Sequence, residues 1–270
     1  QGEEVTILDA EGNIENKRSV IVITSQNNII SNLTITGGFT LGSGGGILYT
    51  AGNNLLLRDI IISENSAQGF GSGIYIDGPC DINNAIIKNN DFFTESSNGM
   101  GAIYIDIYPQ IGNIKISNSI IMNNSGGIGG GLFAGFLDSE LNDIELIIEN
   151  TIFKNNSANL GAGGIYIQYT MVPIIFKNVS IYNNEAPIGA GIIINGSQNI
   201  TFHNSVIYNN SATDYSGGLH LIYSANTNLI NTIIWNNTPE SINLIPDTEE
   251  HVPNINYSNI EGDTTWYGEG

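Results

Sequence analysis

Apolar residues in this chain come in short runs, and many of them alternate with polar residues at every second position. The segment Ile200-Thr201-Phe202-His203 is an example. A period of two places alternate side chains on one face of a strand. No stretch shows a capped helical period of useful length. The pattern therefore predicts many short strands, each with one inward face, and no helix.

A seven-residue segment recurs along the chain and sets its period. The copy at Asn150–Asn156 has the sequence Asn-Thr-Ile-Phe-Lys-Asn-Asn. The copies end, at intervals of 25 to 34 residues, at Asn65, Asn90, Asn124, Asn156, Asn184, Asn210 and Asn237. A second signature, mostly Gly-Gly before an apolar triplet, keeps the same period. Its first apolar residues are Ile47, Ile74, Ile103, Leu132, Ile165, Ile192 and Leu219.

Each repeat contains three strand-like runs, here called A, B and C. Run A follows the glycines, as at Gly163–Ile167. Run B precedes the first Asn of the seven-residue segment, and run C follows that Asn. Parallel strands joined by helices would need longer connections than this repeat offers. The sequence therefore predicts an all-β fold, a parallel β-helix of about eight coils with three strands in each coil.

The first Asn of each segment marks a sharp bend between runs B and C. Asn tolerates a positive φ better than most residues, and its carboxamide can pair with the Asn of the next coil. Asp59 takes this position in one coil, where an ionised carboxylate cannot donate a hydrogen bond. We expect a ladder of carboxamides along this corner, with its chemistry changed at Asp59.

The repeat resembles the right-handed parallel β-helix repeat proteins that bacteria secrete. Thr232–Asn237 and Asn256–Gly262 carry this resemblance. Gly101–Ile103 and Phe153–Asn156 resemble, more loosely, the paired motifs of chlamydial polymorphic outer membrane proteins, which prefer Phe where most copies here have Ile. The resemblance implies a right-handed, pectate-lyase-like solenoid. It leaves function open, since this fold supports adhesins, lyases, hydrolases and stalks.

Composition and charge limit the classes of binding partner that we expect. The 270 residues contain 26 Asp and Glu against seven Lys and Arg, a formal net charge of −19. Nucleic acid and anionic membrane surfaces are disfavoured, because both need clustered cations. No apolar run approaches the length of a membrane-spanning segment, so direct membrane insertion is not expected. Cations, extracellular glycans, or other copies or domains of the same surface protein are the expected partners.

The organisation of the chain suggests one extended domain. Residues 1–270 form a single β-helix domain in this interpretation, as part of a longer protein, because the pattern starts mid-coil and neither end shows a cap. Cys80 is the only cysteine and lies at an inward position of run B, so it is expected to be buried. No cofactor is required by any motif, and secretion or display at the cell surface is expected from the resemblance.

The outward position of run A carries an aromatic residue in four successive coils: Tyr75, Tyr104, Phe133 and Tyr166. Stacked one coil apart, these rings are expected to form an exposed strip that binds sugar rings. Cross-strand stacking that only stabilises the sheet is the alternative. A second strip, at Tyr182, Tyr208 and Trp235 in run C, has the same two interpretations, with the structural one favoured.

Asp77 and Asp106 lie two residues after Tyr75 and Tyr104, on the same outward face. Two carboxylates one coil apart should repel, which raises one pKa. Such a pair could bind Ca²⁺ or act as a catalytic acid and base. Two solvated surface carboxylates are the plainer interpretation.

The basic residues and the histidines give little support to a catalytic function. No basic residue clusters beside the two aspartates, although Lys88 and Lys154 share an outward column of run C, and lyases on this fold need a base. The histidines, His203, His220 and His251, lack metal-ligand spacing and are expected at the surface.

Three functions remain. The favoured one is an extracellular or cell-surface structural or adhesive module, forming a stalk or filament, without catalysis. The alternatives are a carbohydrate-active domain, lyase or hydrolase, that uses Asp77 and Asp106, and a glycan-binding module without turnover that uses the aromatic strip. The departures from the repeat at Asp91–Met100 and Phe136–Asp143 fall near that face.

Overall fold

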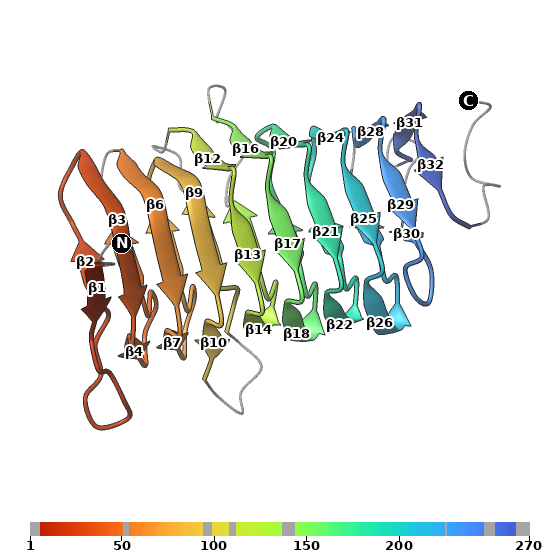
Figure 1. The fold of residues 1–270 in the computed structure, drawn as a ribbon. Helices are drawn as coiled ribbons and strands as arrows, with labels where there is room; N and C mark the ends of the chain where they lie inside the picture. The colour runs from red at the N-terminus through yellow and green to blue at the C-terminus, as the bar shows by residue number, and fades with distance from the viewer. Residues whose placement is uncertain are drawn as a thin grey trace, which may run out of the picture.

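The computed structural model describes residues 6–50, 54–93, 99–107, 112–136, 144–224, 226–245 and 252–262. Over these residues the chain is a right-handed parallel β-helix of about eight coils, as predicted (Figure 1). No helix occurs among the described residues, and so none that could cross a membrane. The departures from the repeat at Asp91–Met100 and Phe136–Asp143 lie partly outside the described residues, as does His251 entirely.

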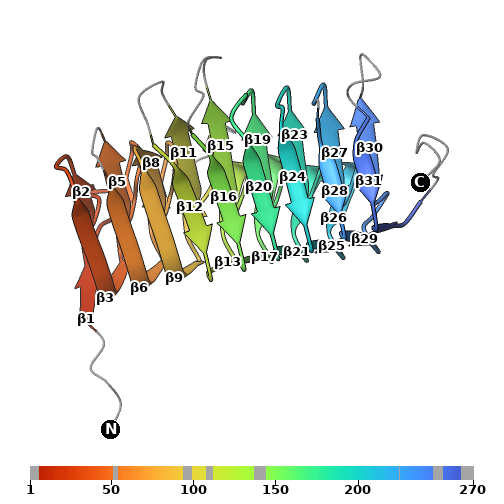
Figure 2. The ribbon, with the colours of Figure 1, turned by 90° about the horizontal axis from the view of Figure 1, so that it is seen from above.

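Run A forms a nine-stranded parallel sheet along one side of the solenoid (Figure 2). Its strands, in order, are β2 (Ile21–Ile23), β5 (Ile47–Thr50), β8 (Ile74–Asp77), β11 (Ile103–Ile107), β15 (Leu132–Phe136), β19 (Ile165–Gln168), β23 (Ile192–Asn195), β27 (Leu219–Ile222) and β30 (Ile242–Ile245). Equivalent residues pair from coil to coil, so Tyr104 lies between Tyr75 and Phe133.

Runs B and C share a sixteen-stranded sheet that bends at the predicted corner. In the first coils one strand covers both runs: β3 (Asn28–Thr36), β6 (Leu55–Ser63) and β9 (Cys80–Lys88), with β1 (Thr6–Asp9) paired to β3. Run B continues in β12 (Ile114–Ser117), β16 (Leu146–Glu149), β20 (Ile174–Lys177), β24 (Ile200–His203), β28 (Asn228–Ile230) and β31 (Asn254–Asn256). Run C continues in β13 (Ile120–Met122), β17 (Ile152–Lys154), β21 (Ser180–Tyr182), β25 (Val206–Tyr208), β29 (Ile233–Trp235) and β32 (Asn259–Ile260).

A short fourth run, not anticipated from the sequence, follows run C in most coils. It forms a three-stranded sheet of β4 (Phe39–Thr40), β7 (Ser66–Ala67) and β10 (Asp91–Phe92), and a four-stranded sheet of β14 (Ser125–Ile128), β18 (Ser157–Gly161), β22 (Glu185–Ile188) and β26 (Ser211–Tyr215). Glycines then make the bend into run A possible. A Cβ on Gly163, for example, would lie 2.5 Å from the carbonyl oxygen of Glu185.

The core is a set of stacked columns. Run B contributes its alternating positions, including Phe176 and Phe202, whose rings stack with centroids 4.5 Å apart. Run C has consecutive apolar residues, so the sequence did not show which of them face the core. In the structure the middle residue points inward, at Ile87, Ile121, Phe153, Ile181, Ile207 and Ile234. Cys80 is buried, as predicted, and burial raises the pKa of its thiol.

Ladders of asparagines line the corners around run C. At the B–C corner the predicted positive φ is confirmed, with values of 49° to 55° from Asp59 to Asn231. Carboxamides pair there, as in Asn178 to Asn150 at 2.9 Å, and Asp59 accepts from Asn84 at 2.6 Å. The last Asn of each segment forms a buried ladder. The Nδ2 group of Asn156, for example, donates to the Oδ1 atom of Asn184 at 3.1 Å and to the carbonyl of Ile121 at 3.1 Å.

Candidate functional site

The four predicted aromatic residues of run A do stack in one column. Ring centroids are 5.3 Å apart for Tyr75 and Tyr104, 5.2 Å for Tyr104 and Phe133, and 5.4 Å for Phe133 and Tyr166. The ring planes lie within 10° of parallel. Each inner ring therefore has both faces covered by its neighbours.

The expectation that this column is an exposed strip is wrong at its centre. Tyr104 is 8% exposed and Phe133 is 3% exposed. Phe70, in the turn before β8, stacks on Tyr104 with centroids 4.7 Å apart and planes 15° from parallel. A sugar ring has no free aromatic face at these two residues, so the geometry favours the stabilising interpretation there.

Asp77 and Asp106 lie where the sequence placed them, on the outward face of β8 and β11. The Tyr75 hydroxyl donates to the Asp106 Oδ2 atom at 3.0 Å. Burial raises the pKa of Asp77, and the neighbouring Asp106 carboxylate raises it further. Burial and Asp106 together raise the pKa of Tyr75, so this hydroxyl stays protonated and keeps donating at neutral pH.

Asp77 and Asp106 alone supply few ligands for a metal ion. Over the described part of the chain, no group of three or more His, Cys, Asp or Glu side chains gathers to hold a metal ion. Thr50 and Gly135 occupy the matching positions in the coils on either side. Ca²⁺ prefers six to eight oxygen ligands, so two carboxylates supply only part of a site. Ca²⁺ binding by Asp77 and Asp106 remains a prediction.

The second aromatic strip, in run C, is more open. Lys88, Met122, Lys154, Tyr182, Tyr208 and Trp235 form one outward column, which confirms that the two lysines share it. The rings of Tyr182 and Tyr208 stack at 4.8 Å. Tyr208 is 37% exposed and Trp235 is 46% exposed. The open end of this column is therefore accessible to a ligand.

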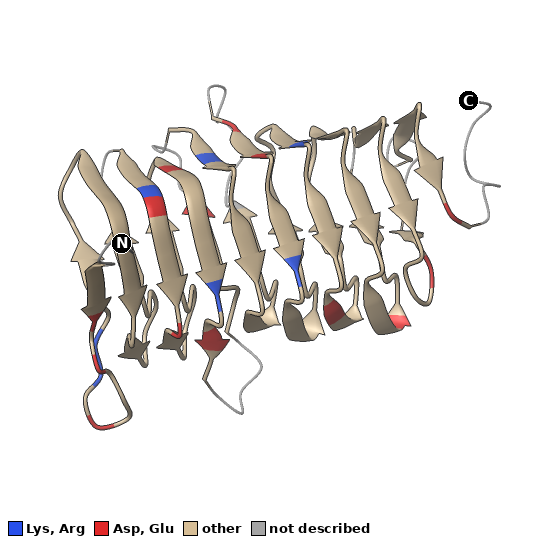
Figure 3. Cartoon of the chain, in the orientation of Figure 1, with Lys and Arg blue, Asp and Glu red and all other residues tan. Residues whose placement is uncertain are grey.

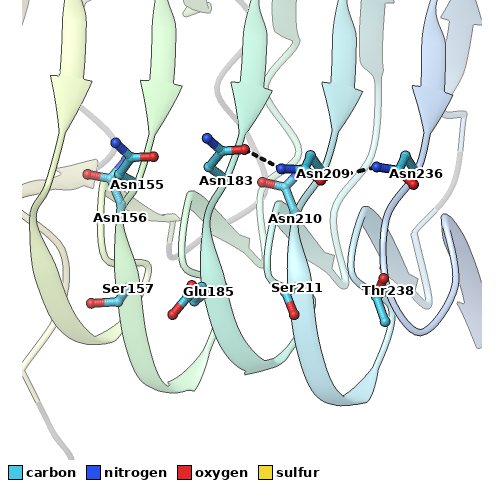
Figure 4. Close-up of a pocket in the computed structure, with 10 residues that line it drawn as sticks. All are labelled: Asn155, Asn156, Ser157, Asn183, Glu185, Asn209, Asn210, Ser211, Asn236 and Thr238. Atoms are coloured by element: carbon cyan, nitrogen blue, oxygen red, sulfur yellow. Dashed lines mark hydrogen bonds between the residues drawn. The ribbon is translucent and has the colours of Figure 1, made fainter.

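A polar groove runs beside this strip, along the turn after run C. Its volume is about 660 Å³. Figure 4 shows the groove, with the outer asparagines Asn183, Asn209 and Asn236 forming a chain of hydrogen bonds. The Asn209 Nδ2 group donates to the Asn183 Oδ1 atom at 2.6 Å, and the Asn236 Nδ2 group donates to the Asn209 Oδ1 atom at 3.1 Å. The other lining residues are Asn155, Asn156, Ser157, Glu185, Asn210, Ser211 and Thr238.

The sequence analysis did not predict this groove as a binding site, although the Asn-Asn pairs that line it are visible in the sequence. In the Asn-Asn pairs that follow run C, the second residue is buried and supports the wall, while the first is exposed. In the last three of these coils the exposed Asn directly follows an aromatic residue of the strip, as Asn183 follows Tyr182 and Asn209 follows Tyr208. The repeat therefore places a carboxamide beside each ring, at the spacing of one coil.

A second, apolar groove of about 620 Å³ lies beyond the aromatic column of run A, over β19, β23 and β27. Its floor includes Tyr166, Ile193 and His220. The expectation that His220 lies at the surface is wrong, since its side chain is 3% exposed. Burial lowers the pKa of His220, against the opposing effects of Asn243 and Glu240. The imidazole is therefore neutral at pH 7, and this groove floor carries no charge.

Comparisons with known proteins agree with the fold. The family model described as the right-handed β-helix region matches residues 138–268, just under half of the chain. A curated relative is the probable autotransporter YfaL of Escherichia coli K12, 28% identical over 164 residues. The match covers 54% of this chain and 12% of YfaL.

A solved structure with the same architecture is the A-module of the mannuronan C-5 epimerase AlgE4 from Azotobacter vinelandii. Its TM-score is 0.53 at 13% identity, covering 88% of this chain and 65% of that module. At this identity the likeness shows the fold alone. The structure and these matches agree on the fold, a right-handed parallel β-helix, as the sequence predicted.

Proposed function

We propose that this chain is a non-catalytic adhesive module, displayed outside the cell, that binds neutral glycans along the polar groove beside Tyr182, Tyr208 and Trp235. The observation that carries the proposal is the groove itself. Ligand sites are concavities of several hundred Å³ with a few well-placed polar groups, and this groove of about 660 Å³ is lined by carboxamides and hydroxyls.

The chemistry of the groove suits a chain of sugar hydroxyls. A carboxamide offers two donors and one acceptor, and a hydroxyl does both. In the Asn183–Asn209–Asn236 ladder each hydrogen bond uses one Nδ2 hydrogen and one Oδ1 lone pair, which leaves further donors and acceptors for a ligand. Trp235, exposed at the end of the strip, offers an apolar ring on which a pyranose can pack.

The location outside the cell is supported by the likeness to an autotransporter. The net charge of −19 supports glycans or other copies of the protein as partners, over nucleic acid or an anionic membrane. No cofactor enters the proposal, because hydrogen bonding and ring packing need none.

A glycan array with an assay for newly released sugar ends tests this proposal. We expect binding of neutral glycans without new ends. The Trp235→Ala variant should weaken binding about tenfold or more, as loss of an aromatic anchor does. Tyr257→Ala is the matched control, since Tyr257 is 92% exposed. Release of new ends, or equal binding by the Trp235 and Tyr257 variants, would contradict the proposal.

A carbohydrate-active domain is the second candidate. It is favoured by the raised pKa of Asp77, beside an Asp106 that the Tyr75 hydroxyl holds in place. A carboxyl that stays protonated at higher pH can act as a general acid. The same array tests this candidate, because new sugar ends should then appear with the wild type. They should disappear with the double variant Asp77→Asn, Asp106→Asn.

A further inference from the structure

We infer that the apolar groove over β19, β23 and β27 is a docking site for a partner protein, which inserts an aromatic side chain flanked by basic residues. This face is separate from the glycan groove, so the inference does not depend on the proposed function. Four observations carry it: how the groove arises, what fills the equivalent place elsewhere, how far the apolar surface extends, and the local charge.

The groove arises at one position of a column that borders run A. The residues of this rim column are Phe70, Met100, Ile128, Gly161, Ile188 and Tyr215. After each member, the next backbone N–H donates to the carbonyl of the following member, as from Gly129 to Gly161 at 3.0 Å and from Ala162 to Ile188 at 2.9 Å. The column therefore keeps its register through all six coils, and only Gly161 lacks a side chain.

The rim column covers the outward column of run A, displaced by one coil. Phe70 stacks on Tyr104, which belongs to the next coil. A Cβ added to Gly161 would lie 3.1 Å from the Ile193 Cδ1 atom, again in the next coil. Ile193 therefore reaches close to the backbone of Gly161, and no rim side chain covers it there. A β-bulge in β18 brings Gly161 to this rim position. In β18 two residues lie between Ala158 and Gly161, whereas in the paired strand β14 one residue lies between Gly126 and Ile128. The extra residue of β18 displaces Leu160 outward.

The chain itself shows what fits over this column. Where the rim carries Phe70, an aromatic ring lies 4.7 Å from the ring of Tyr104 and nearly parallel to it. Tyr166 ends the stack of aromatic rings, and its neighbour in the next coil is Ile193. By the same displacement of one coil, the rim position of Gly161 lies over Ile193, next to Tyr166. An aromatic side chain entering there would take the position that Phe70 takes over Tyr104, with Ile193 beneath it in place of a ring.

The surrounding surface is wider than one ring, which favours a protein over a small molecule. Leu160 is 44% exposed, Tyr215 is 58% exposed and Ile245 is 40% exposed, and all three line the groove. Exposed apolar patches of this kind mark interaction sites, where an aromatic anchor in a central pocket supplies much of the binding energy.

Charge specifies the flanks of the partner segment. After Lys177 the sequence contains nine Asp and Glu residues and no Lys or Arg. In Figure 3 the blue Lys and Arg residues accordingly stop before the last coils. Asp214 precedes the rim residue Tyr215, and Glu240 accepts from Asn243 of the groove at 2.7 Å. Basic residues beside the inserted ring would be attracted by the carboxylates of Asp214 and Glu240.

Methyl NMR of the whole chain, titrated with capped peptides, tests the inference. The probe Lys-Gly-Tyr-Gly-Lys should shift the methyl signals of Ile193, Ile222 and Ile245 in a saturable way. Replacing its Tyr by Ala, or both Lys by Glu, should weaken binding about tenfold or more. Equal binding by either replacement would overturn the aromatic or the basic part of the inference. Equal binding by N-acetyltyrosinamide alone would show a small-molecule site instead.

Two variants place the site. Gly161→Met should fill the groove and weaken peptide binding about tenfold or more, whereas Asn159→Met, at an exposed position outside the groove, should not. Tyr215→Ser removes an exposed rim side chain without touching the core, so its effect is free of folding defects. The inference fails if the peptide shifts no groove methyl, or if Gly161→Met and Tyr215→Ser both bind like the wild type.

Discussion

The buried asparagine ladder is expected to be a main source of stability, and Asn156→Ala tests this in mid-stack. The Asn156 Oδ1 atom accepts from the Asn124 Nδ2 group at 3.0 Å and from the Asn124 backbone N–H at 3.1 Å. Removing the carboxamide leaves both donors buried without these partners. At about 1–3 kcal/mol for each orphaned buried group, the loss is about 2–6 kcal/mol.

Urea unfolding followed by circular dichroism measures this loss as a change in midpoint at constant slope. Asn155→Gly is the control, because it removes a neighbouring exposed carboxamide and tolerates the φ of 53° at that position. The control should change the free energy of unfolding by about 0.5 kcal/mol or less. Equal effects of Asn156→Ala and Asn155→Gly would refute the reasoning. Faster amide exchange at Asn124 should accompany the loss.

Three further predictions concern the titratable groups of the N-terminal coils. The pKa of Asp77 is raised in the folded protein, so Asp77 favours folding at low pH, and this contribution to stability is lost as pH rises through that pKa. Asp77→Asn removes the ionised carboxylate, so it should raise the urea midpoint at pH 7. The same substitution should have less effect near pH 3, where Asp77 is protonated. If Asp77 and Asp106 bind Ca²⁺, adding Ca²⁺ should raise the melting temperature of the wild type but not of the double Asn variant, and equal shifts would exclude this site. Cys80 is buried and its pKa is raised, so its thiol should react with a disulfide reagent only in denaturant, and fast labelling of the native protein would contradict this.

Local pattern was sufficient to predict the coil, because each coil repeats the same short-range chemistry. The alternation at Ile174 and Phe176 predicted the inward face of run B, and the tolerance of Asn for positive φ predicted the corner at Asn178. Register followed from the period, which is why the Tyr75–Tyr104 stack was predicted correctly.

Exposure could not be predicted in the same way, because it depends on segments that the period does not align. Tyr104 is covered by Phe70, which belongs to a rim column whose six residues are of five different types. Asn155 and Asn156 look alike in sequence, and only the direction of the chain after the corner decides which of them is buried. The groove beside Gly161 depends on one extra residue in β18, a shift too small to stand out within a repeat of variable length.

The most direct test of the proposed glycan-binding function is calorimetric titration with neutral oligosaccharides of increasing length, taken from the best array ligand. The exposed asparagines recur once per coil, about 4.8 Å apart. Affinity should therefore rise with chain length until the oligosaccharide spans Asn183, Asn209 and Asn236, and Trp235→Ala should lower it. An affinity that is already maximal for a monosaccharide, or that Trp235→Ala leaves unchanged, would contradict binding along this groove.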